Sequence, residues 1–217
     1  MPGSDMFATD PAKLREAVKR AVDKYTGSPY VKVGVSNRHI HISREDLDEL
    51  FGKDRALSPR KELLPGQYAC DETVTIIGRK NRLERVRILG PVRKTTQVEI
   101  SLTDAFTLGV RAPVNESGNL TGAASVIIEN PENGAWIERA CAIAALRHVH
   151  LSLEFAAKYS LRNGQIVSLA FEGPRALTFG EVLVRVSGEF TDEIHIDTDE
   201  ANAGRIKNGD FGKIIAR

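Results

Sequence analysis

A six-residue motif occurs twice in the chain and constrains its fold more than any other feature. RHIHIS at residues 38–43 returns as RHVHLS at residues 147–152, and the two copies hold four of the five histidines. In an extended strand, residues i and i+2 point to the same face, so each copy presents two imidazoles side by side. The apolar residue between them faces the other way. The repeat predicts two metal-binding pairs in two related halves of the chain.

Composition narrows the class of protein. A chain of 217 residues with 41% apolar and 27% charged residues is typical of a globular protein with one large or two small domains. Lys and Arg number 30 against 29 Asp and Glu, which predicts no nucleic-acid or membrane-surface role but permits local basic pockets for an anion. No apolar run approaches the roughly 20 residues that span a bilayer, and the first residues lack the layout of a signal peptide, so we expect a cytoplasmic protein.

The first predicted element is an amphipathic helix within an N-terminal extension, residues 1–29. Asp10 suits its cap and Pro11 its first turn, and apolar residues recur at helical spacing as far as Tyr25. Two interpretations stay open: a helix docked on its own domain, and an exposed tag that recruits a partner.

From residue 30 onward, short strands, tight turns and short helices alternate. Strands are predicted at 30–35, 73–77, 83–89, 95–100, 125–128, 135–137, 141–146, 166–171, 177–186 and 213–216. Turns are expected at 64–68, 161–165 and 206–210. Short helices follow Ser43, Ser101 and Ser152, and another covers 199–203. The pattern favours a mainly β fold of two small β-barrel domains capped by short α-helices over an α/β sheet.

Counting ligands divides the candidate metal residues into two sets. Catalytic zinc keeps three protein ligands and one open position, so five histidines and one acid supply two such sets. Our grouping is His39, His41 and Glu99 for one metal, and His148, His150 and His195 for the other. Spacing alone leaves Glu45, Asp46 and Asp104 as alternatives to Glu99, and it does not choose the metal.

Arg93 is the predicted phosphate-binding residue. It lies in the sequence GPVRKTT at residues 90–96, six residues before Glu99. An arginine near a metal suits phosphate, because its planar fork binds two oxygens at once. Cys70 and Cys141 form no CxxC motif, and we expect both to be reduced and buried.

Three long motifs together resemble the PduL-type phosphate propanoyltransferases, also called phosphotransacylases. They are VSNRHIHIS at 35–43, LGPVRKTTQVEIS at 89–101 and IHIDTDEANA at 194–203. The resemblance runs from about Tyr30 to the C-terminus. It implies two β-barrels, one of residues 38–145 and one of residues 30–37 plus 146–217. It also implies two zinc ions per chain and a homodimer.

The resemblance assigns roles to individual residues. It gives the same two zinc sets as the count above and Arg93 for phosphate. Around coenzyme A it suggests Ser36, Lys61, Arg87, Leu89, His195 and Asn202. One departure is SLEF at 152–155 where SPED is usual in the family, which we expect to alter a helix start and not the metal.

The implied activity is that of an acyltransferase of class EC 2.3.1. Propanoyl-CoA or acetyl-CoA and phosphate would give acyl phosphate and coenzyme A, reversibly, with no serine or cysteine nucleophile. Family members serve propanediol degradation inside bacterial microcompartments or work free in the cytosol. The N-terminal helix would then be an address read by shell or core proteins.

Two alternatives from other classes remain. A cupin-like enzyme with a single metal fits the spacing of His39, His41 and Glu45, although the helix predicted from Ser43 includes Glu45. A non-catalytic protein whose zinc ions only staple two barrels is the other, although structural zinc sites are closed by four protein ligands.

Overall fold

The computed structural model describes residues 10–64 and 66–216, which form two compact units. Unit 1 contains residues 10–34, 148–195 and 203–216, and unit 2 contains residues 35–147 and 196–202 apart from residue 65. Each unit is built around a closed ring of six strands. The predicted mainly β fold of two barrels with short helices is therefore confirmed, while the predicted domain boundaries stay predictions.

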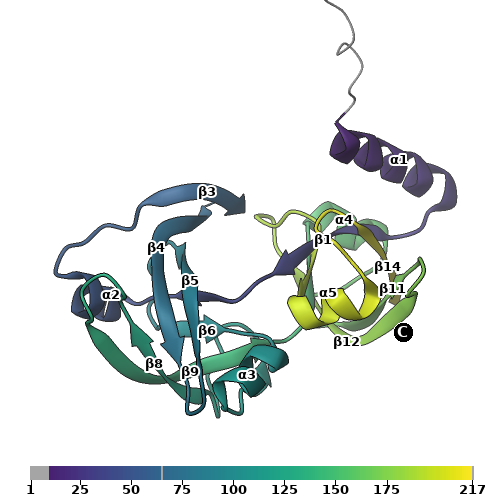
Figure 1. The fold of residues 1–217 in the computed structure, drawn as a ribbon. Helices are drawn as coiled ribbons and strands as arrows, with labels where there is room; N and C mark the ends of the chain where they lie inside the picture. Colours follow the sequence, from purple (N-terminus) through teal and green to yellow (C-terminus); the bar gives the residue numbers. More distant parts are fainter. Residues whose placement is uncertain (1–9, 65, 217) are drawn as a thin grey trace, which may run out of the picture. The chain divides into compact units, whose positions relative to one another are not determined.

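The strands of unit 2 close into a ring because β8 pairs with both β9 and β4 (Figure 1). The ring runs β4 to β5 to β2 to β6 to β9 to β8, and β8 pairs back with β4. The bounds are β2 (His39–His41), β4 (Gln67–Ile77), β5 (Arg82–Gly90), β6 (Gln97–Glu99), β8 (Ala124–Glu129) and β9 (Trp136–Ala145). Strand β3 (Pro59–Leu64) pairs with β4 outside the ring, and β7 (Val114–Asn115) pairs with β9.

The core of unit 2 is formed by alternate residues of these strands. Ile40, Ile88 and Val98 are fully buried within one apolar cluster. Their neighbours i±1 therefore face outward, and these include His39, His41 and Glu99. Two short helices follow such strands: α2 (Arg44–Phe51) after β2 and α3 (Leu102–Leu108) after β6. Fully buried leucines of α2 join the cluster.

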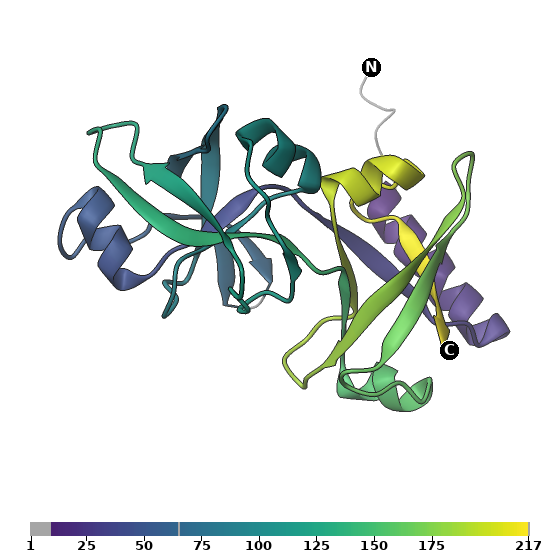
Figure 2. The ribbon, with the colours of Figure 1, turned by 90° about the horizontal axis from the view of Figure 1, so that it is seen from below.

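The barrel of unit 1 has the strand order β1, β13, β10, β12, β11, β14. The bounds are β1 (Tyr30–Ser36), β10 (His148–Leu151), β11 (Ile166–Phe171), β12 (Leu177–Val186), β13 (Glu193–Asp197) and β14 (Phe211–Ala216). The C-terminal strand β14 pairs with both β11 and β1, which joins the first strand of the chain to the last (Figure 2). Helix α4 (Leu153–Lys158) follows β10, and helix α5 (Thr198–Gly204), most of which belongs to unit 2, follows β13.

The two histidine motifs occupy equivalent places in the two rings. Strand β2 lies between the parallel strand β5 and the antiparallel strand β6, and β10 lies between the parallel β12 and the antiparallel β13. Each is followed by a helix capped by the serine of the motif. Ser43 accepts a hydrogen bond from Asp46 N, and Ser152 accepts one from Phe155 N. The sequence repeat is therefore a repeat of structure.

The N-terminal helix α1 (Pro11–Thr26) confirms the predicted helix. Its polar side contacts other parts of unit 1: Arg15 Nη1 lies 3.4 Å from Asp210 Oδ1, and Lys19 Nζ lies 5.0 Å from the centre of the Phe211 ring. Its apolar stripe is exposed, with Leu14 at 54% and Val18 at 55%. None of the described helices is both long and apolar enough to cross a membrane.

Some local predictions were wrong. Strands β3 and β7 were not predicted, and β9 is one continuous strand where two short ones were expected. The first half of β9 was hard to predict from the sequence WIERA at 136–140, because only Ile137 of this stretch is buried. The turn predicted at 64–68 is present but shorter: β3 ends at Leu64, Gly66 lies in the turn and β4 begins at Gln67, while Pro65 lies outside the described residues.

Candidate metal centres

Strand register brings the first candidate cluster together. His39 lies directly opposite Glu99 in the antiparallel pair of β2 and β6, and His41 follows on the same face. His39 Nε2 lies 3.4 Å from Glu99 Oε2, and His41 Nε2 lies 3.8 Å from Glu99 Oε1. All three side chains are largely buried, and that of Glu99 is 11% exposed.

Neighbouring groups hold two of these side chains in a coordinating orientation. His39 Nδ1 lies 2.7 Å from the carbonyl oxygen of Asn37, so it donates its proton there and leaves Nε2 as the free nitrogen. Glu99 Oε1 accepts hydrogen bonds from Gln97 Nε2 at 2.6 Å and Ser117 Oγ at 2.9 Å. Because both bonds are made to Oε1, the other oxygen, Oε2, is the one that faces the imidazole of His39.

The electrostatics of the first cluster suit a cation. Burial, followed by the charges of His39 and Arg93, lowers the pKa of His41 to about 3, so its imidazole is neutral. Burial by itself would raise the pKa of Glu99, but His39, His41, the Ser117 hydrogen bond and Arg93 together outweigh it and lower the pKa. A neutral imidazole beside an ionised carboxylate is the state that binds a metal.

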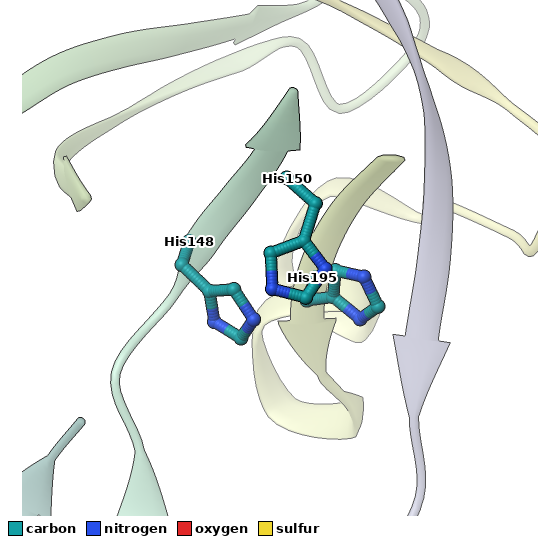
Figure 3. Close-up of side chains that lie close together, drawn as sticks. All are labelled: His148, His150 and His195. Atoms are coloured by element: carbon teal, nitrogen blue, oxygen red, sulfur yellow. The ribbon is translucent and has the colours of Figure 1, made fainter. Parts of the chain in front are cut away.

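The second candidate cluster consists of three histidines from β10 and β13 (Figure 3). His148 lies directly opposite His195 in the antiparallel pair, and His150 follows on the same face. The ring centroid of His195 lies 4.9 Å from that of His148 and 4.7 Å from that of His150. Burial, then the charges of His148 and Arg185, lowers the pKa of His150 to about 3. The ring of Phe190 stacks on His150 with centroids 4.0 Å apart.

Both clusters fit a metal ion with three protein ligands. In each set, one ligand atom from every residue lies within 4.8 Å of the others. A tetrahedral zinc ion holds its ligand atoms roughly 3.4 Å apart, so small side-chain movements suffice. The Nε2 atom of His150 is buried and has no hydrogen-bond partner among the described residues. A buried imidazole nitrogen left in this state is costly unless something binds it.

The alternatives to Glu99 have other roles in the structure. Glu45 lies in α2 and belongs to neither three-residue set. Asp46 binds Arg139, with Oδ1 2.7 Å from Arg139 Nη2, and Asp104 Oδ1 lies 2.8 Å from Arg38 Nη2. Because Glu45 lies in α2, it does not join His39 and His41 in a three-residue cluster, as the cupin-like alternative requires.

Arg93 lies beside the first cluster. Its backbone N–H donates to the carbonyl oxygen of Ile42 at 2.9 Å, and Ser43 and Arg93 form an isolated β-bridge. Its charge contributes to lowering the pKa values of His41 and Glu99. The loop of residues 91–96 is therefore attached to the segment that leaves the first histidine pair.

Register places several predicted coenzyme A residues on the same outer face as the first cluster. Lys61 and Leu89 both pair with Ala69, from opposite sides, and Arg87 pairs with His39. Directly paired residues point to the same side of a sheet, and Arg87 and Leu89 are two apart on β5. Arg87 Nη1 also donates to the carbonyl oxygens of Cys70 at 2.9 Å and Asp71 at 2.8 Å.

The remaining predicted residues lie elsewhere in the chain. Ser36 ends β1, and Asn202 lies in α5; both belong to unit 2, whereas His195 belongs to the second cluster in unit 1. Cys70 and Cys141 are buried and free, as predicted. Burial raises the pKa of the Cys70 thiol to about 11 and that of Cys141 to about 12, which suits neither for nucleophilic attack.

Comparison with known proteins decides the family. The family model described as phosphate propanoyltransferase matches residues 32–207. The chain is a member of the phosphate propanoyltransferase family. Its relatives include the phosphate propanoyltransferase of Thermotoga maritima, 52% identical over 86% of this chain and 90% of that protein. Those of Lachnoclostridium phytofermentans (46% identical, 85% and 87% covered) and Clostridioides difficile (42%, 94% and 98%) are also similar. The resemblance seen in the sequence motifs, and with it membership of an acyltransferase family, is confirmed.

The structure adds supporting residues that the sequence interpretation missed, and it gives Asp46 a different role. Gln97 and Ser117 hold Glu99, and Thr96, Asp46 and Arg139 join the loop of residues 91–96 to helix α2 and strand β9. One comparison could have drawn attention to Gln97: the two copies of the motif aligned on Glu99 and His195. Gln97 stands two residues before Glu99, and Glu193 stands two residues before His195.

Proposed function

We propose that this phosphate propanoyltransferase family member interconverts a short acyl-CoA and phosphate with acyl phosphate and coenzyme A. The observation that carries the proposal is the place of Arg93, whose loop is attached directly after the first histidine pair and whose charge acts on His41 and Glu99. An arginine side chain beside a cation site is an arrangement that binds a phosphate dianion.

We further propose one zinc ion in each three-residue cluster, two per chain. His39, His41 and Glu99 would hold one, and His148, His150 and His195 the other. Bound zinc would supply positive charge at the thioester oxygen, the leaving sulfur or the phosphate. Three ligands with an open position speak for catalytic ions and against the alternative in which zinc only staples the fold.

The residues of the chain would act mainly by positioning. Arg93 would hold phosphate so that one of its oxygens meets the thioester carbonyl carbon. A carbon–oxygen bond forms, the carbon–sulfur bond breaks, and the electron pair leaves with the sulfur of coenzyme A. Neither cysteine is needed as a nucleophile, in agreement with the raised pKa values of Cys70 and Cys141.

Coenzyme A would be bound by Ser36, Lys61, Arg87, Leu89, His195 and Asn202. Support comes from the shared face of Lys61, Leu89 and Arg87 and from the register of Arg87 with His39. The acyl group would be propanoyl or acetyl. The names of the relatives favour propanoyl.

Assembly and location are a further part of the proposal. The enzyme would act as a cytoplasmic homodimer, and helix α1 would deliver it to the shell or core proteins of a microcompartment. The exposed stripe of Leu14, Val18 and Val22 gives that helix a surface for a partner. Deleting residues 1–27 should abolish encapsulation and leave folding intact, and loss of folding would show instead a helix needed by its own unit.

A thiol-release assay tests the activity. Propanoyl-CoA should release coenzyme A at a rate that depends on phosphate and on bound zinc, and acyl phosphate should appear in equal amount. Thiol release independent of phosphate would point to hydrolysis and contradict the proposal. A single iron or manganese ion per chain with no thiol release would favour the cupin-like alternative.

A further inference from the structure

We propose that Thr96, Asp46 and Arg139 form a positioning network that fixes Arg93 for phosphate binding. The inference rests on the proposed role of Arg93. None of the three side chains is assigned to phosphate, coenzyme A or metal, so their effect would be exerted through the loop that carries Arg93.

The loop of residues 91–96 is attached to the first histidine motif at two points. Arg93 N–H donates to the carbonyl oxygen of Ile42 at 2.9 Å. Three residues later, the hydroxyl oxygen of Thr96 accepts a hydrogen bond from Ser43 N–H at 3.0 Å. The two bonds hold both ends of the segment from Arg93 to Thr96 against Ile42 and Ser43. The backbone of this short segment therefore has little freedom.

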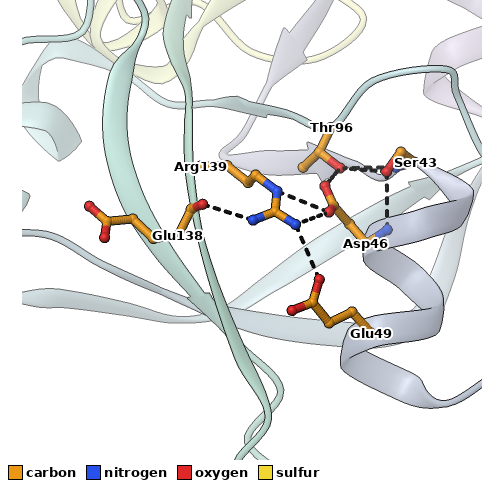
Figure 4. A network of polar contacts seen from close by, with 6 residues as sticks. All are labelled: Ser43, Asp46, Glu49, Thr96, Glu138 and Arg139. Atoms are coloured by element: carbon orange, nitrogen blue, oxygen red, sulfur yellow. Dashed lines mark hydrogen bonds and ion pairs between the residues drawn. The ribbon is translucent and has the colours of Figure 1, made fainter.

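The second attachment depends on the orientation of the Thr96 hydroxyl. That hydroxyl contacts a carboxylate oxygen of Asp46 closely and lies 3.3 Å from Ser43 Oγ, which itself caps α2 by accepting from Asp46 N–H (Figure 4). A hydroxyl has a single proton. When Asp46 accepts that proton, the oxygen of Thr96 presents its lone pairs to Ser43 N–H.

Arg139 holds Asp46 in place from another strand. Its Nε and Nη2 atoms lie 3.0 and 2.7 Å from Asp46 Oδ1, and Nη2 also donates to Glu49 at 3.2 Å (Figure 4). Asp46 is 4% exposed, and a buried carboxylate requires such a partner. The hydrogen bond to Asp46 is the largest cause that raises the pKa of Arg139. The path therefore runs from β9 through α2 to the loop.

The second copy of the motif lacks this arrangement. Ser152 N–H also donates to a side chain three residues before the third ligand, but that side chain is Asp192, at 2.8 Å. Where the first copy has Arg93 six residues before Glu99, the second has Glu189 six residues before His195. The network around Thr96 therefore occurs in the copy that contains Arg93, as expected if the network positions that arginine.

Thr96→Val removes the hydroxyl and keeps the shape of the side chain, which makes it the sharpest test. We expect the KM for phosphate to rise about 5- to 10-fold, the size of one lost hydrogen bond. The KM for propanoyl-CoA and the content of two metal ions per chain should stay unchanged. Thr96→Ser keeps the hydroxyl and should restore most of the phosphate affinity. Thr75→Val, at another buried threonine of unit 2, is the matched control.

A double-mutant cycle separates positioning from direct contact. In an Arg93→Ala background, Thr96→Val should change the KM for phosphate by less than about 2-fold, because its effect passes through Arg93. Equal effects in both backgrounds would overturn the inference, as would an unchanged phosphate KM in Thr96→Val. If Thr96→Val fails to fold, Arg139→Gln tests the same path from its outer end, where the side chain is 37% exposed.

The same experiment distinguishes this inference from the proposed function. If Arg93→Ala itself leaves the phosphate KM unchanged, the role of Arg93 fails and the network has nothing to position. If Arg93→Ala raises that KM while Thr96→Val and Arg139→Gln do not, only the network is contradicted.

Discussion

The two candidate metal clusters share one backbone frame and differ in what is placed on it. In both, a histidine pair lies on a strand between a parallel and an antiparallel neighbour, and the antiparallel neighbour supplies the third residue. The first cluster contains the carboxylate of Glu99, with Arg93 six residues before it. The second contains His195, with Glu189 at that position.

This difference separates the expected tasks of the two copies. A carboxylate ligand lowers the net charge of a bound metal ion, and the nearby cationic loop with Arg93 and Lys94 restores it, which suits an anionic substrate. In the second copy, Glu189 and Phe190 occupy the corresponding loop, and Phe190 stacks on His150. We therefore expect phosphate at the first cluster and attribute no phosphate binding to the second.

Removal of a ligand should have the largest effect. His39→Ala in the first cluster and His148→Ala in the second should each reduce phosphate-dependent thiol release by about 10³-fold, the scale of losing a preorganised charge at a reacting oxygen. Steady-state rates with propanoyl-CoA measure this. Full activity in either variant would contradict a role for both clusters, because it would show that only one of them takes part in the reaction.

Arg93→Ala should raise the KM for phosphate about 10- to 100-fold, since charged hydrogen bonds to the substrate are lost. The corresponding change in the second copy, Glu189→Ala, should leave the phosphate KM within about 2-fold. Initial rates at varied phosphate and saturating propanoyl-CoA give both values. Equal effects at the two positions would contradict the assignment of phosphate to the first copy.

Gln97→Ala should lower the metal affinity of the first cluster by about 10-fold, because Nε2 of Gln97 donates a hydrogen bond to Oε1 of Glu99 and holds that carboxylate. Competition with a coloured chelator measures it, and the second cluster should be unaffected. Gln165→Ala, at a glutamine of a turn in unit 1, is the control. A matching loss at both clusters would mean that Gln97 acts on general stability.

The stability of metal-free protein should fall in acid. The pKa values of His41 and His150 are lowered to about 3, so the unfolded chain binds protons more readily than the folded one below pH 6.5. Their contribution is fully present above pH 6.5 and is lost progressively as the pH falls to about 3. Thermal unfolding with excess chelator should show a Tm that decreases over this window. A His41→Asn or His150→Asn variant should decrease less, and an unchanged slope would contradict the buried, neutral state.

The histidine motif revealed more of this molecule than any other stretch of sequence. Alternation in RHIHIS and RHVHLS predicted both the strands and the outward pairs, because period-two geometry is local. The serine caps and following helices were predicted correctly for the same reason. Strand β7, two residues long, and β3, which begins at a proline, carry too little pattern to be predicted.

The supporting residues depend on long-range register, which a single sequence does not contain. Glu99 could be suggested by counting ligands, but only the pairing of β2 with β6 places it opposite His39. Arg139 is 93 residues from Asp46, and nothing near either residue indicates the other. The bond from Ser117 to Glu99 likewise follows from the loop after α3, which a single sequence does not place beside β6.

Metal stoichiometry tests the central claim most directly. Elemental analysis of the purified protein should give two zinc ions per chain, falling to one in His39→Ala and to one in His148→Ala, and to none in the double variant. One ion per chain in the unmodified protein, or two retained in either single variant, would contradict a duplicated frame with one metal centre in each copy.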